Sequence, residues 1–121
     1  MVNSHLMIQD YAGITVVTFS DSSILDARVI EGMGKSLYEL TDVHDHKKII
    51  LDFVNVKLLS SQTIGILLTM RKKMVTAKGT FLLCGLRKEV MKLFTITNLD
   101  KQFDFFPDDV AALASFGVFV K

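Results

Sequence analysis

The sequence predicts an α/β fold: a small mixed central β-sheet with about four helices, in the order ββαβαβαβα. Two observations predict it. Short apolar runs rich in β-branched residues alternate with segments in which apolar residues recur at helical spacing. Helices that cross between parallel strands must also cover a face of their sheet. The chain has 121 residues, 50% hydrophobic and 22% charged, which fits one compact domain over residues 1–121.

The first half contains a hairpin, a helix and a buried strand. Residues 6–8 and 14–19 flank a turn signal at residues 12–13, so we expect them to pair. Asp26 is the expected N-cap of a helix, although the two glycines in that helix each cost about 1 kcal/mol relative to alanine. Residues 48–53 form an apolar run without alternation, which is typical of a strand buried on both faces. The apolar stripe of the helix consists of Ile30, Met33, Leu37 and Leu40.

The second half continues the alternation of strand and helix. Residues 55–59 are expected to form a loop, after which Ser60 or Ser61 caps a helix that stops near residues 78–79. In this helix we expect one buried stripe, with Ile66, Met70 and Met74 beside it, either partly exposed as a partner surface or covered by a neighbouring helix. The expected stripe is Ile64, Leu67, Leu68 and Val75.

The remaining elements are two strands and two short helices. Residues 80–84 and 103–106 are strand candidates, and a short helix is expected around residues 90–94. Pro107 with two aspartates opens a last helix, where proline and acidic residues are favoured. Its expected buried side is Val110, Leu113 and Ala114.

Charge and cysteine usage argue against several classes of function. The net charge is +1, and no run of Lys and Arg is long enough for nucleic acid binding. The longest apolar stretch, residues 64–70, is too short to be inserted in a bilayer. The N-terminus lacks the layout of a signal peptide, and one cysteine cannot form an internal disulfide. We therefore expect a cytoplasmic protein.

The polar residues 60–63 (Ser-Ser-Gln-Thr), at the expected start of a helix, have two physical interpretations. A serine oxygen at a helix start accepts a hydrogen bond from a free N–H group, so the cluster could serve only as a cap. A phosphate at the same place is favoured by the unpaired N–H groups and the helix dipole, so a serine here could also be a phosphoacceptor. The residues by themselves leave both interpretations open.

The segment from residue 48 to residue 68 resembles the centre of STAS domains. In that family a strand of type Ile-Val-Leu-Asp-Leu precedes an apolar loop and then Asp-Ser-Ser-Gly or Asp-Ser-Thr-Gly at a helix start. Here Lys-Ile-Ile-Leu-Asp-Phe at 48–53 precedes Ser-Ser-Gln-Thr at 60–63. Residues 24–27 (Ile-Leu-Asp-Ala) resemble the family's entry into its first helix, and residues 83–94 with Asn98-Leu99 resemble its later strand-loop-helix unit. The order and spacing of these pieces, over residues 6–116, are specific for the fold.

The resemblance implies a STAS-like fold and the function of bacterial anti-sigma factor antagonists. Ser61 falls on the family's phosphorylated serine, while Ser60, Gln62 and Thr63 replace its Asp, Ser or Thr, and Gly. Such proteins dock on an anti-sigma factor that is also a serine kinase, and a PP2C-type phosphatase removes the phosphate. The expected partner-binding residues are Ser23, Leu25, Leu58, Leu59, Ser60, Ser61, Gln62, Thr63, Ile66 and Met70.

The changed motif keeps a second function open. STAS-like chains also occur as structural subunits of lipid-transport ATPase complexes and of stress-signalling assemblies, where no phosphate is needed. A homodimer through the apolar face of the helix that starts at Ser61 is a further open alternative.

Other short motifs are not expected to carry chemistry. Residues 34–36 (Gly-Lys-Ser) imitate a phosphate-binding loop, but Val29 stands where its first glycine belongs. His44 and His46 offer two metal ligands without a third cluster, and Cys84 ends a buried strand. No serine-hydrolase elbow surrounds Ser61. We expect no enzyme, and no catalytic, metal-binding or cofactor-binding residues.

Overall fold

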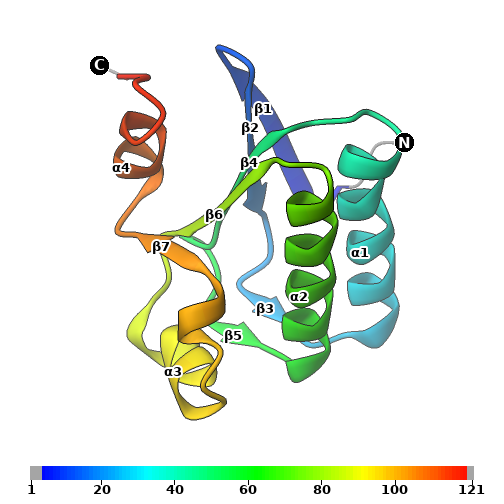
Figure 1. Ribbon diagram of the computed structural model, residues 1–121. Coiled ribbons are helices and arrows are strands. Elements are labelled where there is room, and N and C mark those ends of the chain that lie inside the picture. Colours follow the sequence, from blue (N-terminus) through cyan, green and yellow to red (C-terminus); the bar gives the residue numbers. More distant parts are fainter. Residues whose placement is uncertain (1–3, 120–121) are drawn as a thin grey trace.

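The computed structural model describes residues 4–119 and has three layers (Figure 1). A central five-stranded sheet carries two long helices side by side on one face and a short helix on the other. The elements are β1 (Leu6–Tyr11), β2 (Ile14–Phe19), β3 (Ser23–Ile24), α1 (Ala27–Asp42), β4 (Lys48–Asp52), β5 (Leu58–Leu59), α2 (Ser61–Thr76), β6 (Thr80–Cys84), α3 (Lys88–Ile96), the 3₁₀ turn η1 (Asp100–Gln102), β7 (Asp104–Phe106) and α4 (Asp109–Ala114).

The central sheet is mixed, as the sequence predicts. Its strand order is β1-β2-β4-β6-β7, in which β1 is antiparallel to β2 and every other pair is parallel. The unpatterned strand β4 lies in the middle, where both of its faces are covered and residues 49–52 are buried. This confirms the interpretation of that run as a central strand and the expected α/β fold with four helices.

A second, two-stranded sheet was not predicted. Strands β3 and β5 pair in parallel, apart from the central sheet. Each is two residues long, which is too short for alternation to be recognised. Residues 58–59, expected to be loop, therefore form a strand.

Helix α1 begins as the sequence predicts. The Oδ1 atom of Asp26 accepts a hydrogen bond from the N–H of Arg28 at 2.9 Å and a longer one from the next residue. The predicted stripe is buried against the sheet and α2. Gly34 lies where the two helices approach each other, because a Cβ placed there would lie only 2.8 Å from the Cδ1 atom of Ile66.

Helix α2 buries Ile64 and Leu67 of the expected stripe, but the rest of its buried face differs. Met70 and Met74 are fully buried in the core that α1, α2 and α3 form with the sheet, whereas Val75 is 62% exposed. Of the two alternatives for these methionines, cover by neighbouring elements is therefore the one that the structure shows. Apolar residues cover more than half of the girth of α2, so the sequence pattern is compatible with several orientations, and contact with both the sheet and α1 selects one. The buried face is Thr63, Ile64, Leu67, Met70 and Met74.

Helix α4 covers the opposite face of the sheet. Ala112 and Leu113 pack there in a second apolar cluster with Ile14, Val16, Ile50, Leu82 and Cys84. The predicted buried residue Leu113 is confirmed, but Val110 is 48% exposed and Ala114 is only partly buried. The helix has six residues and starts at the N-cap Asp108, so its single buried turn is centred on residues 112–113.

Two glycine substitutions test the packing of α1 against α2. Gly65 is exposed, and no atom lies within 4 Å of the position that a Cβ would occupy there, so Gly65→Ala should raise the free energy of unfolding by about 0.5–1 kcal/mol through helix propensity. Gly34→Leu should lower it by about 1–3 kcal/mol, because the larger side chain overpacks the contact with Ile66. Urea denaturation measures both. Equal effects of the two substitutions would contradict the close approach of the helices.

Candidate partner-binding surface

Ser61 is the first residue of α2 and its side chain is exposed. The preceding residue, Ser60, is the N-cap with extended backbone angles, but it makes no side-chain capping hydrogen bond. The simple capping interpretation of this cluster therefore does not describe the geometry. The first-turn N–H groups are left without a side-chain acceptor, which makes the start of α2 favourable for a negatively charged group.

The two residues that follow Ser61 differ in position. Gln62 is exposed, whereas Thr63 is only 3% exposed and faces the core. The Thr63 hydroxyl lies 3.5 Å from the hydroxyl of Ser60, and the Thr63 N–H donates to the Ser60 carbonyl at 3.1 Å. Thr63, at the position of the family's glycine, thus packs on the core side of the helix start, while Ser61 lies on the solvent side.

The β3–β5 pair positions the chain on either side of this helix start. In its register Ser23 pairs with Leu58 and Ile24 with Leu59. The Ser60 N–H then donates to the Ile24 carbonyl at 3.1 Å, which extends the ladder to the cap of α2. Residues 23–25 are therefore held beside residues 58–62, although they are more than thirty positions apart in sequence.

Alternation along this small sheet separates buried from exposed side chains. Ile24 and Leu59 point into the core, while Ser23 and Leu58 point to solvent, with Leu58 54% exposed. Leu25, directly after β3, is 56% exposed. We call the residues of these segments that reach solvent the rim. It consists of Ser23, Leu25, Leu58, Ser60, Ser61 and Gln62, of which Ser60 is half-buried.

Four residues expected on the partner-binding surface do not belong to the rim. Leu59, Thr63 and Met70 are all buried, at 7%, 3% and 0% exposure. Ile66 is half-buried against α1 at Gly34. Leu59 alternates inward from Leu58, Thr63 and Met70 face the core, and Ile66 packs in part against α1, so none of the four belongs to the rim.

Sequence reasoning missed one exposed apolar residue near these elements. Val54, in the loop between β4 and β5, is 52% exposed. A hydrogen bond anchors this loop to the end of β2, because the Asn55 side chain donates to the Phe19 carbonyl at 3.1 Å. An apolar residue directly after a buried strand gave no signal that distinguished it from the strand itself.

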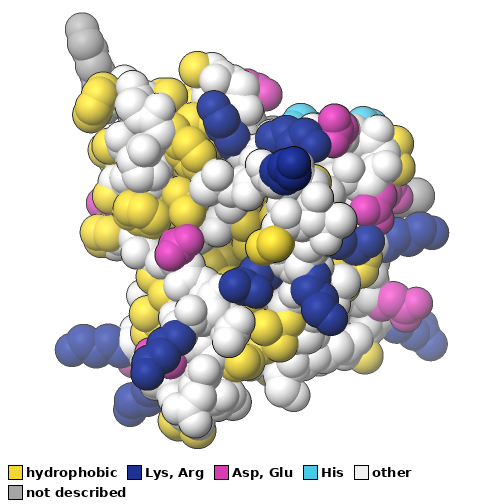
Figure 2. Space-filling model, in the orientation of Figure 1, with side chains coloured by type: hydrophobic (Ala, Val, Ile, Leu, Met, Phe, Trp, Pro, Cys, Tyr) yellow, Lys and Arg dark blue, Asp and Glu magenta, His cyan; other side chains and the backbone are white. Residues whose placement is uncertain are grey.

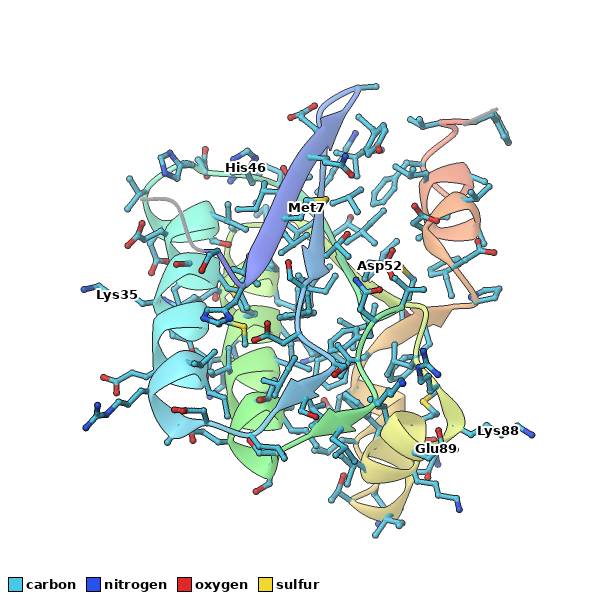
Figure 3. The ribbon with its side chains drawn as sticks, turned by 180° about the vertical axis from the view of Figure 1, so that it is seen from behind. Met7, Lys35, His46, Asp52, Lys88 and Glu89 are labelled. Atoms are coloured by element: carbon cyan, nitrogen blue, oxygen red, sulfur yellow. The ribbon has the colours of Figure 1, made fainter. Side chains whose placement is uncertain are left out.

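Asp52 and Cys84 end the neighbouring parallel strands β4 and β6. Asp52, labelled in Figure 3, is 7% exposed, and its Oδ1 atom accepts a hydrogen bond from the Val54 N–H at 3.0 Å. Burial, with a smaller contribution from Asp109, raises the pKa of the Asp52 carboxyl. Burial and the neighbouring Asp52 also raise the pKa of the Cys84 thiol far above its ordinary value. The thiol stays protonated at neutral pH, which suits a core residue and not a nucleophile.

The other motifs singled out in the sequence lie apart from the rim. Residues 34–36 are in the middle of α1, where Lys35 points to solvent (Figure 3) and Ser36 is buried. The Nδ1 atom of His46 lies 2.8 Å from the Thr15 hydroxyl, and His44 is exposed. Within residues 4–119 no group of three His, Cys, Asp or Glu side chains is placed to hold a metal ion. In the same range, the helices are all too short or too polar to cross a membrane.

An open pocket lies at the far end of α2 from Ser61. It has a volume of about 330 Å³ and is lined in part by Arg71, Lys101 and Asp104. Figure 2 shows Lys and Arg side chains in several separate groups on this face. The pocket is separate from the rim, because none of the rim residues lines it.

The buried carboxyl of Asp52 leads to a pH prediction. Between the ordinary aspartate pKa and the raised folded-state pKa, the folded protein binds more protons than the unfolded chain, so stability falls as pH rises. Asp52→Asn cannot ionise, yet its side-chain oxygen still accepts the Val54 N–H. The free energy of unfolding of Asp52→Asn, relative to wild type, should increase from about pH 4 to pH 7. A difference that does not change with pH, measured by urea denaturation, would contradict this.

Comparisons with known proteins agree with the geometry. The STAS domain family profile matches residues 5–112. Three solved structures match closely. An anti-sigma factor antagonist described from Thermotoga maritima has a TM-score of 0.82, with 17% identity over 96% of this chain and 97% of that one. One from Mycobacterium paratuberculosis has a TM-score of 0.79, with 20% identity over 93% of each chain. The antagonist SpoIIAA in its unphosphorylated form has a TM-score of 0.78, with 16% identity over 95% of this chain and 99% of that one.

The structural matches are at low identity and show the shared fold. No curated protein matches the sequence. The family follows from the profile, which covers most of the chain and includes the β3–β5 ladder and the start of α2. The chain belongs to the STAS domain family.

Proposed function

We propose that this chain is a regulatory protein of the anti-sigma factor antagonist type, which docks on an anti-sigma factor through the rim. In this proposal the partner is also a serine kinase, and phosphorylation of Ser61 controls docking. The observation that carries the proposal is the position of Ser61: it is exposed, it is the first residue of α2, and no side chain caps that helix start. No enzymatic activity of the chain is part of the proposal.

The chemistry of a phosphate suits this position. A phosphoserine carries close to two negative charges and three acceptor oxygens. At Ser61 these oxygens would lie beside the first N–H groups of α2 and at the positive end of the helix dipole. The first turn of α2 contains no acidic residue that would repel the phosphate. The modified serine is therefore stabilised by the helix start itself.

The rim also suits an interface that a phosphate can disrupt. Leu25 and Leu58 expose more than half of their side chains, although their neighbours Ile24 and Leu59 are buried. Exposed apolar side chains next to polar ones are typical of a surface that becomes dry on binding a partner. A phosphate on the adjacent Ser61 would have to lose its water in the complex, so phosphorylation should weaken docking.

One matched structure supports control by phosphorylation. SpoIIAA from Bacillus is also known in a phosphorylated form, which matches this chain with a TM-score of 0.72 and 14% identity over 92% of it. We place the same cycle for this chain in the cytoplasm, with a PP2C-type phosphatase removing the phosphate.

A second function is favoured by the changed motif. Ser60, Gln62 and Thr63 replace all three family residues around the acceptor. The chain also matches a sulfate transporter family protein from Wolinella succinogenes, with a TM-score of 0.71 and 15% identity over 87% of this chain. The same fold therefore also occurs in a protein of a transporter family. A structural subunit of a lipid-transport ATPase or of a stress-signalling assembly would use the rim without phosphate.

Phosphorylation is tested with Mg-ATP and the purified anti-sigma factor kinases of the source organism. Intact mass should increase by one phosphate in the wild type and in the matched control Ser60→Ala, because Ser60 is half-buried and Ser61 is the exposed serine at the helix start. Ser61→Ala should stay unmodified. Label that remains on Ser61→Ala would refute the site. Failure of every kinase to label the wild type, together with co-purification with a transport ATPase, would favour the structural subunit.

Docking is tested separately by titration calorimetry with the same anti-sigma factors. Leu58→Ser should weaken binding by roughly 10-fold or more, since a half-buried apolar contact is typically worth about 1–3 kcal/mol. Val75→Ser is the matched control, because Val75 is 62% exposed at the other end of α2. Ser61→Glu should weaken binding and Ser61→Ala should not. An equal loss for Leu58→Ser and Val75→Ser would place the interface elsewhere.

A further inference from the structure

Strand β1 leaves one long edge of the central sheet open. It lies at the end of the strand order and pairs only with β2 among residues 4–119. Seen from behind, it is the strand nearest the viewer, with Met7 on it (Figure 3). An open edge presents unpaired N–H and C=O groups to any further strand. The opposite edge strand, β7, has only three residues, so β1 is the longer template.

The hydrogen bonds to β2 determine which groups of β1 face outward. The Ser20 N–H donates to the His5 carbonyl at 2.9 Å, and these residues continue the register in which Leu6 pairs with Phe19. Hydrogen-bonded and non-hydrogen-bonded pairs alternate along an antiparallel ladder. Residues 7, 9 and 11 are therefore bonded to β2, and the N–H and C=O groups of Leu6, Ile8 and Asp10 point to the open edge.

The side chains of β1 lack the usual protection of an edge strand. Natural edges carry lysines, prolines or bulges that discourage pairing. Residues 6–9 are Leu-Met-Ile-Gln, with no charge, no proline and a continuous register. Met7 is 55% exposed and Ile8 is 47% exposed, one on each face of the sheet. The first charge along the strand is Asp10, near the turn.

We propose that β1 pairs in antiparallel orientation with β1 of a second copy of this chain, with Ile8 on the two-fold axis. Because the outward-facing groups belong to residues 6, 8 and 10, this register joins Ile8 to Ile8 and Leu6 to Asp10, each pair exchanging both of its N–H···O bonds. The two five-stranded sheets become one continuous sheet.

The chemistry of β1 favours a second copy as its occupant. In this register no residue of like charge faces itself, since Asp10 lies opposite Leu6 and Met7 lies opposite Gln9. Apolar Ile8 contacts its own copy across a hydrogen-bonded pair, where Cα atoms are about 5.5 Å apart. The contact is distinct from the open alternative of a dimer through α2, since Met70 and Met74 of that helix are buried.

Charge placed on the axis tests the register. Wild type should show a concentration-dependent dimer in sedimentation velocity between about 10 µM and about 1 mM, the range of small interfaces. Ile8→Lys and Ile8→Glu place like charges opposite each other, so each alone should be monomeric, and an equimolar mixture should form the heterodimer. Gln9→Lys is the matched control: it adds the same charge to β1 but opposite Met7 and not opposite itself, so it should weaken the dimer less than Ile8→Lys does. Thermal unfolding checks that every variant is folded.

Amide exchange in the wild-type protein provides a readout that needs no substitution. As the protein concentration rises, amide exchange at Leu6, Ile8 and Asp10 should slow in proportion to the fraction of protein that is dimeric. The amides of Met7 and Gln9 are already bonded to β2, so their exchange rates should not change. A wild type that remains monomeric up to about 1 mM overturns the proposal. So does a dimer that Ile8→Lys leaves intact, or protection that appears on α2 instead of β1.

Discussion

The surface proposed for partner binding depends on the pairing of β3 with β5. Two short segments, separated in sequence by the whole of α1 and β4, meet in a ladder that ends with the Ser60 N–H bonded to the Ile24 carbonyl. That bond ties the start of α2 to the strand before α1. Without it, Ser61 would still begin a helix, but Ser23 and Leu25 would not be held beside it, and Leu58 would be the rim's one remaining apolar residue there.

The core explains why so little of the apolar sequence remains for partners. Helix α2 packs on the sheet and, at Ile66, against Gly34 of α1, so its methionines are enclosed. Among the exposed apolar side chains, Leu25 and Leu58 lie on the rim, and Met7 and Ile8 lie on the open edge of β1. The two proposed interfaces share no residue, since one lies on β1 and the other around the start of α2.

Much of the fold could be predicted because local signals and tertiary packing agree. Asp26 caps α1 as its position before an apolar repeat indicates, and residues 48–52 form the central strand as their unpatterned apolar run indicates. Prediction failed where one pattern allowed several solutions. Apolar residues surround much of α2, so periodicity could not tell that Met70 faces the core and Val75 faces solvent. The two-residue strands β3 and β5 offered no periodicity at all.

The sequence by itself determined the order of the helices and of the strands of the central sheet, the family resemblance and the location of Ser61 at a helix start, because these depend on residue types and spacing along a single segment. Only the tertiary structure decided which neighbours of Ser61 are accessible. Thr63, Leu59 and Met70 turn inward, and Ser23 and Leu25 are brought alongside from another part of the chain. The physical reason is that exposure depends on contacts between segments distant in sequence, and no local pattern records them.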